Sequence, residues 1–277
     1  MIRNILLATI LFLFPATEYA EEISNNANEP IEFVVVIPSY NNEQWCIANL
    51  ESVVNQTYPH FTICYINDCS TDKTGQLVDQ YIKEKNLEGH LNVIHNGNRK
   101  GAMANLYMAI SRLDPKKVVA VVDGDDRLAH NGVLELLAKT YADRNVWITH
   151  GNYTTEPFTK ESYCEEYSKK TQSKLRFRKS KWMGCQLRTF YAKLFQLIEK
   201  EDLMWKSEFL PMTYDLAIMF PMLEMASFGH IRFISDPIYV VNTVNPISDR
   251  KKNVQLQRDL DKHLRTLPSY KPLKELF

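Results

Sequence analysis

The sequence predicts an α/β protein whose central sheet is mostly parallel and carries helices on both faces. Short β-branched segments alternate with segments of helical periodicity, which is the pattern of βαβ units. The segments FVVVI and KVVAVVD are continuously apolar, as strands covered on both faces require. The 277 residues are 45% hydrophobic and 24% charged, which is typical of a folded globular protein and suits one catalytic domain.

The elements of the first half follow one another in a regular order. A polar linker over residues 23–31 precedes them. Apolar β-branched segments predict strands at 32–37, 61–67, 91–95, 117–122 and 146–150. Helical periodicity predicts helices at 42–55, 73–86, 99–112 and 131–141.

The second half, residues 151–277, has a different composition. Residues 151–187 are polar and basic, and the segment KKTQSKLRFRKSKW (169–182) predicts a mobile surface region. Helices are expected at 188–200 and 213–228, short strands near 231–235 and 238–242, and a terminal helix over 249–266.

The N-terminus has the pattern of a secretory signal peptide over residues 1–22. Arg3 precedes an apolar stretch from Ile5 to Phe14, which is shorter than the roughly 20 residues that a membrane span needs. Export or a location in an endomembrane lumen is therefore expected. An uncleaved N-terminal anchor, and a cytoplasmic protein associated with the membrane, remain the alternatives.

The net charge and the cysteine content limit which partners, metal sites and disulfides are expected. The chain has 33 basic and 33 acidic residues, so no overall attraction to nucleic acid is expected. The basic segment 169–182 leaves an anionic acceptor or peripheral membrane association open. The five cysteines lack the spacing of a zinc site, and one disulfide is expected only if the compartment is oxidising.

Polar residues follow each of the first four predicted strands. Ligands of an open parallel sheet bind beyond the carboxyl ends of its strands. The residues at these ends are Pro38 and Tyr40, then Asp68 and Ser70, then Arg99, Lys100 and Gly101, and finally the sequence DGDD over 123–126. Each group alone has a structural explanation, such as helix capping by Asp68 or Ser70. Their joint occurrence at one edge favours a binding site.

The DGDD sequence is the sharpest of these signals. Its carboxylates repel one another at a semi-buried strand end, which is costly without a counter-charge. In an extended segment Asp123 and Asp125 would point to the same side and share a Mg²⁺ or Mn²⁺ ion. The alternative is an acidic turn that caps the next helix. No G-x-G-x-x-G follows the first strand, which excludes a dinucleotide dehydrogenase, and a nucleotidyltransferase would carry an early Gly-rich loop.

The motifs P-S-Y-N, S-V-x-x-Q-T-Y, N-D-x-S-x-D-x-T and D-x-D-D, in this order, resemble family 2 of the inverting glycosyltransferases, which have the GT-A fold. The resemblance covers residues 32–150 closely and 210–250 weakly. It implies a metal-dependent transferase that moves a hexosyl or N-acetylhexosaminyl group from a nucleoside-diphosphate sugar, with UDP as the expected carrier. The acceptor would be a hydroxyl of a glycan, lipid or protein. Residues 32–150 would then bind the nucleotide sugar and residues 151–277 the acceptor.

The resemblance also assigns roles in donor binding. Pro38 and Tyr40 would line the pocket for the base, and Asp68 would hydrogen-bond it. Arg99, Lys100 and Gly101 would flank the nucleotide and its diphosphate. Asp123 and Asp125 match the D-x-D pair on the ribose and the metal, with Asp125 as the direct ligand. Asn67 stands where the family usually has another aspartate.

The chemical step is assigned to the second half. Asp215 matches the acid that acts as general base at the start of a late helix, although Tyr214 replaces the glutamate that usually precedes it. Arg188 is expected to reach the diphosphate or the acceptor. The departures at Asn67 and Tyr214 keep a second interpretation open, namely a catalytically idle protein that binds a sugar nucleotide or a glycan.

Overall fold

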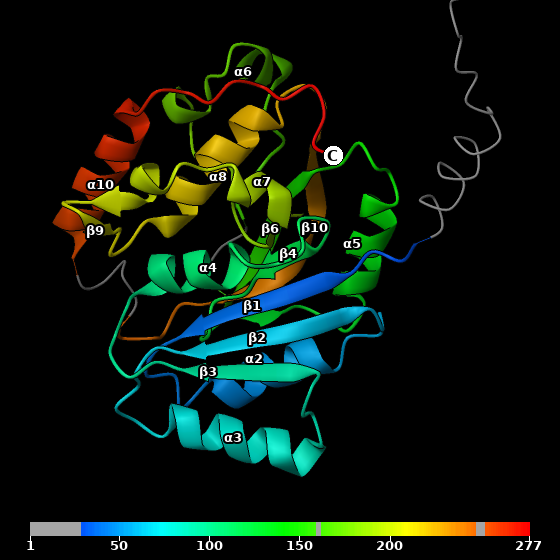
Figure 1. Cartoon of the computed structure of the whole chain (residues 1–277), viewed down its shortest axis with the longest axis vertical. Helices are drawn as coiled ribbons and strands as arrows, with labels where there is room; N and C mark the ends of the chain where they lie inside the picture. The colour runs from blue at the N-terminus through cyan, green and yellow to red at the C-terminus, as the bar shows by residue number, and fades with distance from the viewer. Residues whose placement is uncertain (1–28, 159–161, 248–252) are drawn as a thin grey trace, which may run out of the picture. The chain divides into compact units, whose positions relative to one another are not determined.

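A large sheet organises the protein, with the strand order β3-β2-β1-β4-β7-β6-β10-β5 (Figure 1). The computed structural model describes residues 29–158, 162–247 and 253–277, so the predicted signal peptide and most of the predicted linker lie outside the described residues. The strands of this sheet are β1 (Phe33–Ser39), β2 (Phe61–Asn67), β3 (Leu91–His95), β4 (Val118–Val121), β5 (Arg127–Leu128), β6 (Ile148–Glu156), β7 (Arg188–Tyr191) and β10 (Ile231–Asn242). A separate hairpin pairs β8 (Met204–Trp205) with β9 (Glu208–Phe209).

The sheet is mostly parallel, as the sequence predicts. β1 pairs in parallel with β2 and β4, β2 with β3, and β6 with β10. β7 runs antiparallel between β4 and β6, and β5 is antiparallel to β10. Strands from before and after residue 150 thus share one sheet within a unit that begins at Ile31. The assignment of separate donor and acceptor halves stays a prediction.

The helices cover both faces of this sheet. They are α2 (Cys46–Val54), α3 (Thr74–Lys85), α4 (Ala102–Ile110), α5 (Val133–Tyr141), α6 (Lys169–Ser173), α7 (Ala192–Gln196), α8 (Tyr214–Met225) and α10 (Val254–Thr266), with 3₁₀ turns η1 (Phe177–Lys179) and η2 (Lys200–Leu203). The chain moves from β1 outward to β3 and then returns to β4 on the other side of β1. Because such crossovers are right-handed, α2 and α3 lie on one face and α4 on the other. α7 packs against α4 and α8.

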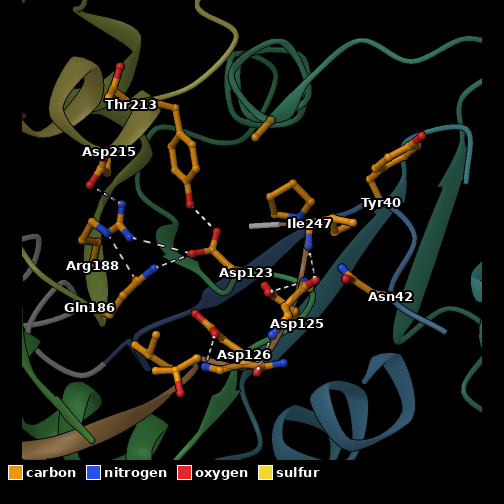
Figure 2. Close-up of a pocket in the computed structure, with 18 of the residues that line it drawn as sticks. Tyr40, Asn42, Asp123, Asp125, Asp126, Gln186, Arg188, Thr213, Asp215 and Ile247 are labelled. Atoms are coloured by element: carbon orange, nitrogen blue, oxygen red, sulfur yellow. Dashed lines mark hydrogen bonds and ion pairs between the residues drawn. The ribbon is translucent and has the colours of Figure 1, made fainter. Parts of the chain in front are cut away.

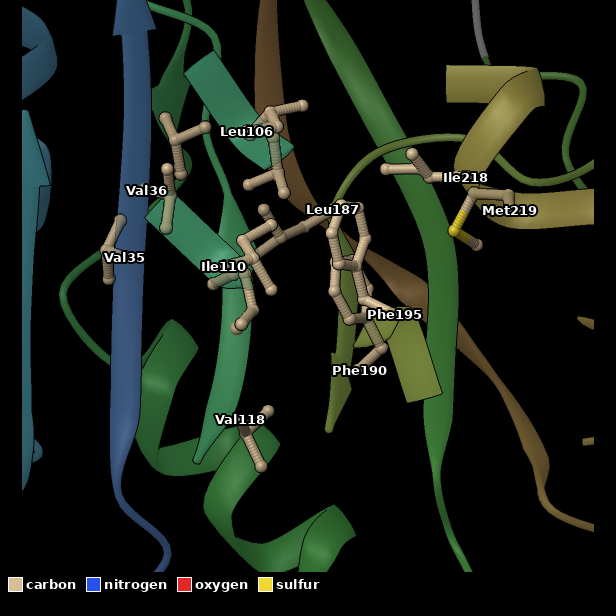
Figure 3. Packing of buried hydrophobic residues seen from close by; sticks show 14 of the residues in the cluster. Val35, Val36, Leu106, Ile110, Val118, Leu187, Phe190, Phe195, Ile218 and Met219 are labelled. Carbon is tan, nitrogen blue, oxygen red and sulfur yellow. The ribbon is translucent and has the colours of Figure 1, made fainter. Parts of the chain in front are cut away.

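The core explains why β1 is continuously apolar. All seven residues of β1 are buried, with Val35 and Val36 fully enclosed. Figure 3 shows Leu106 and Ile110 of α4 packed near β1, with Phe190 of β7 and Phe195 of α7 beside them. The aromatic rings of this last pair are stacked at 6.1 Å. α4 turns Met103, Leu106 and Ile110 to the core, which is the spacing of one helix face.

Two predictions for the second half are wrong. The helix expected at 188–200 is instead strand β7 followed by the short helix α7. The buried backbone of β7 pairs with β4 and β6, and this tertiary pairing outweighs the helical periodicity of the segment. The two short strands expected at 231–235 and 238–242 form the single strand β10, which carries a register shift around Pro237.

The basic segment 169–182 is fastened to the rest of the protein by a buried ion pair. Arg178 donates from Nε and Nη2 to the two carboxylate oxygens of Glu224 at 2.8 and 2.9 Å, and from Nη1 to the carbonyl of Leu264 at 2.7 Å. A disulfide between Cys164 and Cys185 closes the stretch of chain that contains Arg178. Among the described residues, no helix is both long enough and apolar enough to cross a membrane.

Replacing Glu224 by Gln should lower the free energy of unfolding by about 3–5 kcal/mol, because it leaves the Arg178 charge buried without its partner. Side-chain exposures of 4% for Arg178 and 0% for Glu224 justify this range. Chemical denaturation measures it. The matched control is Glu135→Gln, which breaks the exposed pair with Lys139 and should cost less than about 1 kcal/mol. Equal effects of the two substitutions would contradict a stabilising role of the buried pair.

Candidate functional site

A cavity of about 360 Å³ lies at the carboxyl edge of the sheet (Figure 2). Seven residues singled out from the sequence line it: Pro38, Tyr40, Arg99, Asp123, Asp125, Arg188 and Asp215. They come from segments far apart in the chain, so the fold brings the strand-end residues of the first half together with the late acid of the second. Asp68, Lys100 and Gly101 are not among the residues that line this cavity.

The DGDD sequence forms a tight turn and is not extended. The amide of Asp126 donates to the carbonyl of Asp123 at 3.0 Å. The side chain of Asn49, on α2, donates to the carbonyls of Asp123 and Asp126 at 2.9 and 2.8 Å. The expectation that Asp123 and Asp125 point to one side of an extended segment is therefore wrong. Asp123 faces Arg188, whereas Asp125 accepts a hydrogen bond from Asn245 Nδ2 at 2.6 Å.

Gly124 is required by the close approach of this turn to the end of β1. A Cβ atom at this position would lie 2.5 Å from Ser39 Oγ and 2.8 Å from Asn42 Nδ2. The neighbour is the end of β1, whose Ser39 hydroxyl also accepts from Asn42 Nδ2 at 3.0 Å. The glycine thus lets the first and fourth strand ends share one wall of the cavity.

Asp123 is held by neutral donors as well as by a cation. Gln186 Nε2 donates to its Oδ2 at 2.8 Å, and the Tyr214 hydroxyl donates to its Oδ1. Burial and the adjacent charge of Asp123 raise the pKa of Tyr214 well above its usual value, so this hydroxyl keeps its proton. Both carboxylate oxygens of Asp123 are therefore engaged by the protein itself.

Arg188 lies between two carboxylates. Its guanidinium is 4.0 Å from Asp123 Oδ2 and 4.0 Å from Asp215 Oδ2, and Nε donates to Gln186 Oε1 at 3.2 Å. Burial alone would lower the pKa of Arg188, but Tyr214, Asp215 and Asp123 oppose this and hold the pKa above its usual range. Its buried Nη1 makes no hydrogen bond with a described residue. A buried charged donor in this state is suited to an anionic ligand.

At the other end of the cavity, Arg99 covers the ring of Tyr40, which is expected to line the pocket for the base. The guanidinium carbon of Arg99 is 3.9 Å from the centre of the Tyr40 ring, a cation–π contact. The nearby Asn42 is 5% exposed, and its Oδ1 accepts no hydrogen bond from the described residues. The end of β1 thus offers an aromatic face and an unused acceptor.

Asp68 is hydrogen-bonded to the loop that carries Arg99. Its carboxylate accepts from the amides of Lys100 and Gly101 at 2.9 and 2.8 Å and from Asn96 Nδ2 at 2.8 Å. Burial would raise the pKa of Asp68, but these hydrogen bonds outweigh it and hold the pKa below its usual value. Asp68 therefore fixes the loop that carries Arg99, and Gly101, with φ +86°, supplies the left-handed backbone of that loop.

Asp126 also lines the cavity, beside the other acids of the turn. Burial and the charges of Asp125 and Asp123 raise the pKa of Asp126 well above its usual value. The amide of Asn242, at the end of β10, donates to Asp126 Oδ1 at 2.7 Å. The environment of Asp126 disfavours its charged form, which lowers the repulsion within the turn.

Several residues of the site were missed by the sequence analysis. They are Asn42, Asn49, Gln186, Asn242 and Asn245. Asn49 gives a usable signal, because a buried amide interrupts the apolar face of α2. Gln186 and Asn245 come from segments without regular periodicity, and only the folded chain places them against Asp123 and Asp125.

The described residues contain no group of three or more His, Cys, Asp or Glu side chains arranged to hold a metal ion. Both oxygens of Asp123 accept hydrogen bonds from Gln186 and Tyr214, and Asp125 accepts one from Asn245. Mg²⁺ is commonly bound through one or two carboxylates together with substrate phosphates. The residues present therefore fit a cation that is shared with a phosphorylated ligand, and they do not form a complete metal site alone.

Comparison with known proteins identifies the family. The sequence model described as "Glycosyl transferase family 2" matches residues 34–200. An uncharacterized glycosyltransferase of Rickettsia bellii is 34% identical over 145 residues, which are 50% of this chain and 20% of that protein. The poly(ribitol-phosphate) beta-N-acetylglucosaminyltransferase TarS of Staphylococcus aureus is 37% identical over 60 residues, 21% of this chain and 10% of its own length. The chain thus spans a fifth or less of these two relatives.

Solved structures show the same fold. The structure of TarS residues 1–349 with UDP-GlcNAc superposes with a TM-score of 0.55 at 19% identity, covering 78% of this chain and 59% of that one. The mannosyltransferase PcManGT of Pyrobaculum calidifontis, in complex with GDP-Man and Mn²⁺, gives a TM-score of 0.57 at 17% identity, covering 88% and 67%. The predicted GT-A architecture is confirmed by these structures.

Gly124→Ala should destabilise the protein by about 1–3 kcal/mol, since the added methyl group overlaps Ser39 and Asn42. Thermal denaturation measures the change. Gly97→Ala is the matched control, because a Cβ there meets nothing within 4 Å. A Gly124→Ala protein as stable as the Gly97→Ala protein would show that the two strand ends are not in close contact.

Proposed function

The chain belongs to glycosyl transferase family 2, and from this premise we propose that it transfers a sugar from a UDP-linked donor to an acceptor hydroxyl with inversion. The acidic turn would hold a divalent cation, which would neutralise charge on the leaving diphosphate. The observation that carries this proposal is that Asp215 and the acidic turn line the same cavity as Tyr40 and Arg188. Sugar transfer needs a general base in this place, whereas donor binding alone does not.

The relatives support the choice of donor and cation. TarS is named a beta-N-acetylglucosaminyltransferase and has been crystallised with UDP and with UDP-GlcNAc. PcManGT has been crystallised with GDP-Man and Mn²⁺. We propose the UDP-linked donor for this chain because TarS is also related to it in sequence.

The nucleotide binds at the β1 end of the cavity. A planar base stacks on the Tyr40 ring, where Arg99 now lies at 3.9 Å. Arg99 must then turn away from the ring, and the neighbouring diphosphate is the natural partner for its charge. Asp68 contributes by fixing the loop that carries Arg99, through its bonds to Lys100 and Gly101.

The diphosphate lies between the acidic turn and Arg188. The unused Nη1 of Arg188 donates to a phosphate oxygen. Gln186 and Tyr214 keep Asp123 in place beside it. Asp125, with the donor phosphates, would hold Mg²⁺ or Mn²⁺, which would supply Lewis-acid stabilisation of the leaving group.

Asp215 acts as the general base. It takes the proton from the acceptor hydroxyl as the acceptor oxygen bonds to the anomeric carbon. The bond between that carbon and the phosphate oxygen breaks, and the nucleoside diphosphate leaves with the electron pair. Arg188, 4.0 Å from Asp215, balances the negative charge on both sides of the reacting centre.

We further propose that the protein works in an oxidising compartment outside the cytosol. The predicted signal peptide at residues 1–22 supports this location. The disulfide between Cys164 and Cys185 supports it independently, because such bonds persist in exported and lumenal proteins. The disulfide ends one residue before Gln186, so it also fixes the segment that holds Asp123.

Two substitutions separate donor binding from transfer. Asp125→Asn should abolish cation-dependent binding of UDP-GlcNAc. Asp215→Asn should leave that binding intact and lower kcat by roughly 10²–10⁴-fold, the usual contribution of a general base. Calorimetric titration with and without Mn²⁺, combined with a transfer assay over UDP-, GDP- and CMP-sugars, measures both effects.

Asp114→Asn, in an exposed loop, is the control and should change neither quantity. Undiminished transfer by Asp215→Asn would rule out this base. Donor binding by the unmodified protein without transfer from any donor would favour the catalytically idle alternative.

Cys164→Ser should lower the free energy of unfolding by about 2–4 kcal/mol, because a disulfide across 21 residues restricts the unfolded chain. Transfer should also fall as Gln186 loses its support. Cys69→Ser removes a free, half-buried thiol and serves as the control. The protein is isolated from its native compartment, denatured without reductant, and its reactive thiols are counted. Five reactive thiols would contradict both the disulfide and the proposed location.

A further inference from the structure

We propose that a basic surface on this protein docks it on an anionic lipid bilayer. The surface consists of the exposed cations of α6, η1 and their flanks: Lys169, Lys170, Lys174, Arg176, Lys179 and Lys181. These residues lie in the basic segment 169–182. The sequence leaves two partners open for this segment, an anionic acceptor and a membrane surface. The inference concerns where the enzyme works, and it does not depend on the proposed donor or base.

The charge of this surface is mostly positive, although the exposed Glu165 and Glu166 lie in the segment that carries Tyr163. No Asp or Glu occurs between residues 168 and 181, although the whole chain has 33 acidic and 33 basic residues. The six cations form no ion pair with a described carboxylate. Lys170 and Lys174 stand four residues apart, where like charges on a helix repel. An anionic partner would relieve this repulsion.

The surface is a fixed platform. Phe177 and Arg178 of η1 are buried, and Arg178 is bound to Glu224 of α8. Arg265 of α10 donates from Nη1 to the carbonyls of Arg178 and Ser180 at 2.9 and 3.0 Å. The cations therefore keep their places relative to the catalytic domain, and docking through them would orient the whole protein.

An exposed aromatic side chain lies beside these cations. Tyr163 is 39% exposed. The Lys181 ammonium lies 4.8 Å from the centre of the Tyr163 ring, which places Tyr163 beside the basic surface. Aromatic rings combined with Lys and Arg are typical of groups that enter the headgroup region of a bilayer.

The basic surface is separate from the cavity that binds the donor. None of its six residues lines that cavity. Asp215 stands in the first turn of α8, whereas Glu224, the anchor of η1, stands at the other end of the helix. Nine residues at a rise of about 1.5 Å separate them by roughly 14 Å. The basic surface is therefore not a second site for the phosphates of the donor. Figure 1 shows α6 at one end of the fold and α3 at the other.

A bilayer fits these observations better than a soluble polyanion. A polyanion would need the cations alone, whereas a bilayer uses both the cations and the exposed Tyr163 ring.

Vesicle sedimentation with the full chain tests the proposal. Vesicles of phosphatidylcholine alone are compared with vesicles that also contain phosphatidylglycerol. The protein should bind the anionic vesicles more tightly, and this preference should weaken as salt is added. Replacing Lys169, Lys170 and Lys174 together by Gln should lower the affinity for anionic vesicles on the order of a hundredfold. The affinity for neutral vesicles should not change.

The matched control replaces three exposed lysines of α3 and its start, Lys73, Lys83 and Lys85, by Gln. This variant should bind as the unmodified protein does, and circular dichroism should show both variants folded. Equal binding to the two kinds of vesicle, or equal binding by the two variants, would overturn the proposal. Binding of inorganic polyphosphate through Lys169, Lys170 and Lys174, without any binding to vesicles, would also overturn the proposal. Sugar transfer to a soluble acceptor should be unchanged in both variants, which separates this test from that of the proposed function.

Discussion

The site depends on one guanidinium held between two carboxylates. Arg188 is 6% exposed and lies 4.0 Å from both Asp123 and Asp215. From the sequence alone, the acidic turn is expected to bind a divalent cation that relieves the repulsion between its carboxylates. The fold instead compensates it internally, because Arg188 faces Asp123, backbone and amide donors satisfy the turn, and the environment of Asp126 disfavours its charge. In the proposed mechanism, the cation would therefore serve the charge that the donor brings.

This balance links the two halves of the chain. Asp123 follows β4, Arg188 begins β7, and Asp215 lies in the first turn of α8. β4 and β7 are neighbours in the sheet, with Val121 opposite Arg188. A change in the packing of β7 would therefore displace the guanidinium from both carboxylates at once. The disulfide at Cys185 and the hydrogen bond from Gln186 to Asp123 hold the same segment from the other side.

The first half of the fold and its edge residues could be predicted because β1 to β4 are continuous or alternating apolar segments whose ends must meet in a parallel sheet. The family resemblance located Asp215 and Arg188 by motif. Their surroundings could not be predicted, because β7 was taken for a helix. Its short apolar segment fits both periods, and only the pairing with β4 and β6 decides between them. The contacts of Gln186 and Asn245 depend on such pairing, and so does the disulfide partner of Cys185.

The two departures from the family pattern differ in their physical meaning. Asn67 is turned away from the cavity toward His95, whose ring nitrogen lies 3.0 Å from its amide, so its identity hardly affects the donor. Tyr214 lies within the cavity and donates to Asp123. A glutamate here would place another negative charge against Asp123 and compete for Arg188. The tyrosine supplies a neutral donor that keeps its proton, so the exchange preserves the arrangement of Asp123, Arg188 and Asp215 and does not indicate a lost active site.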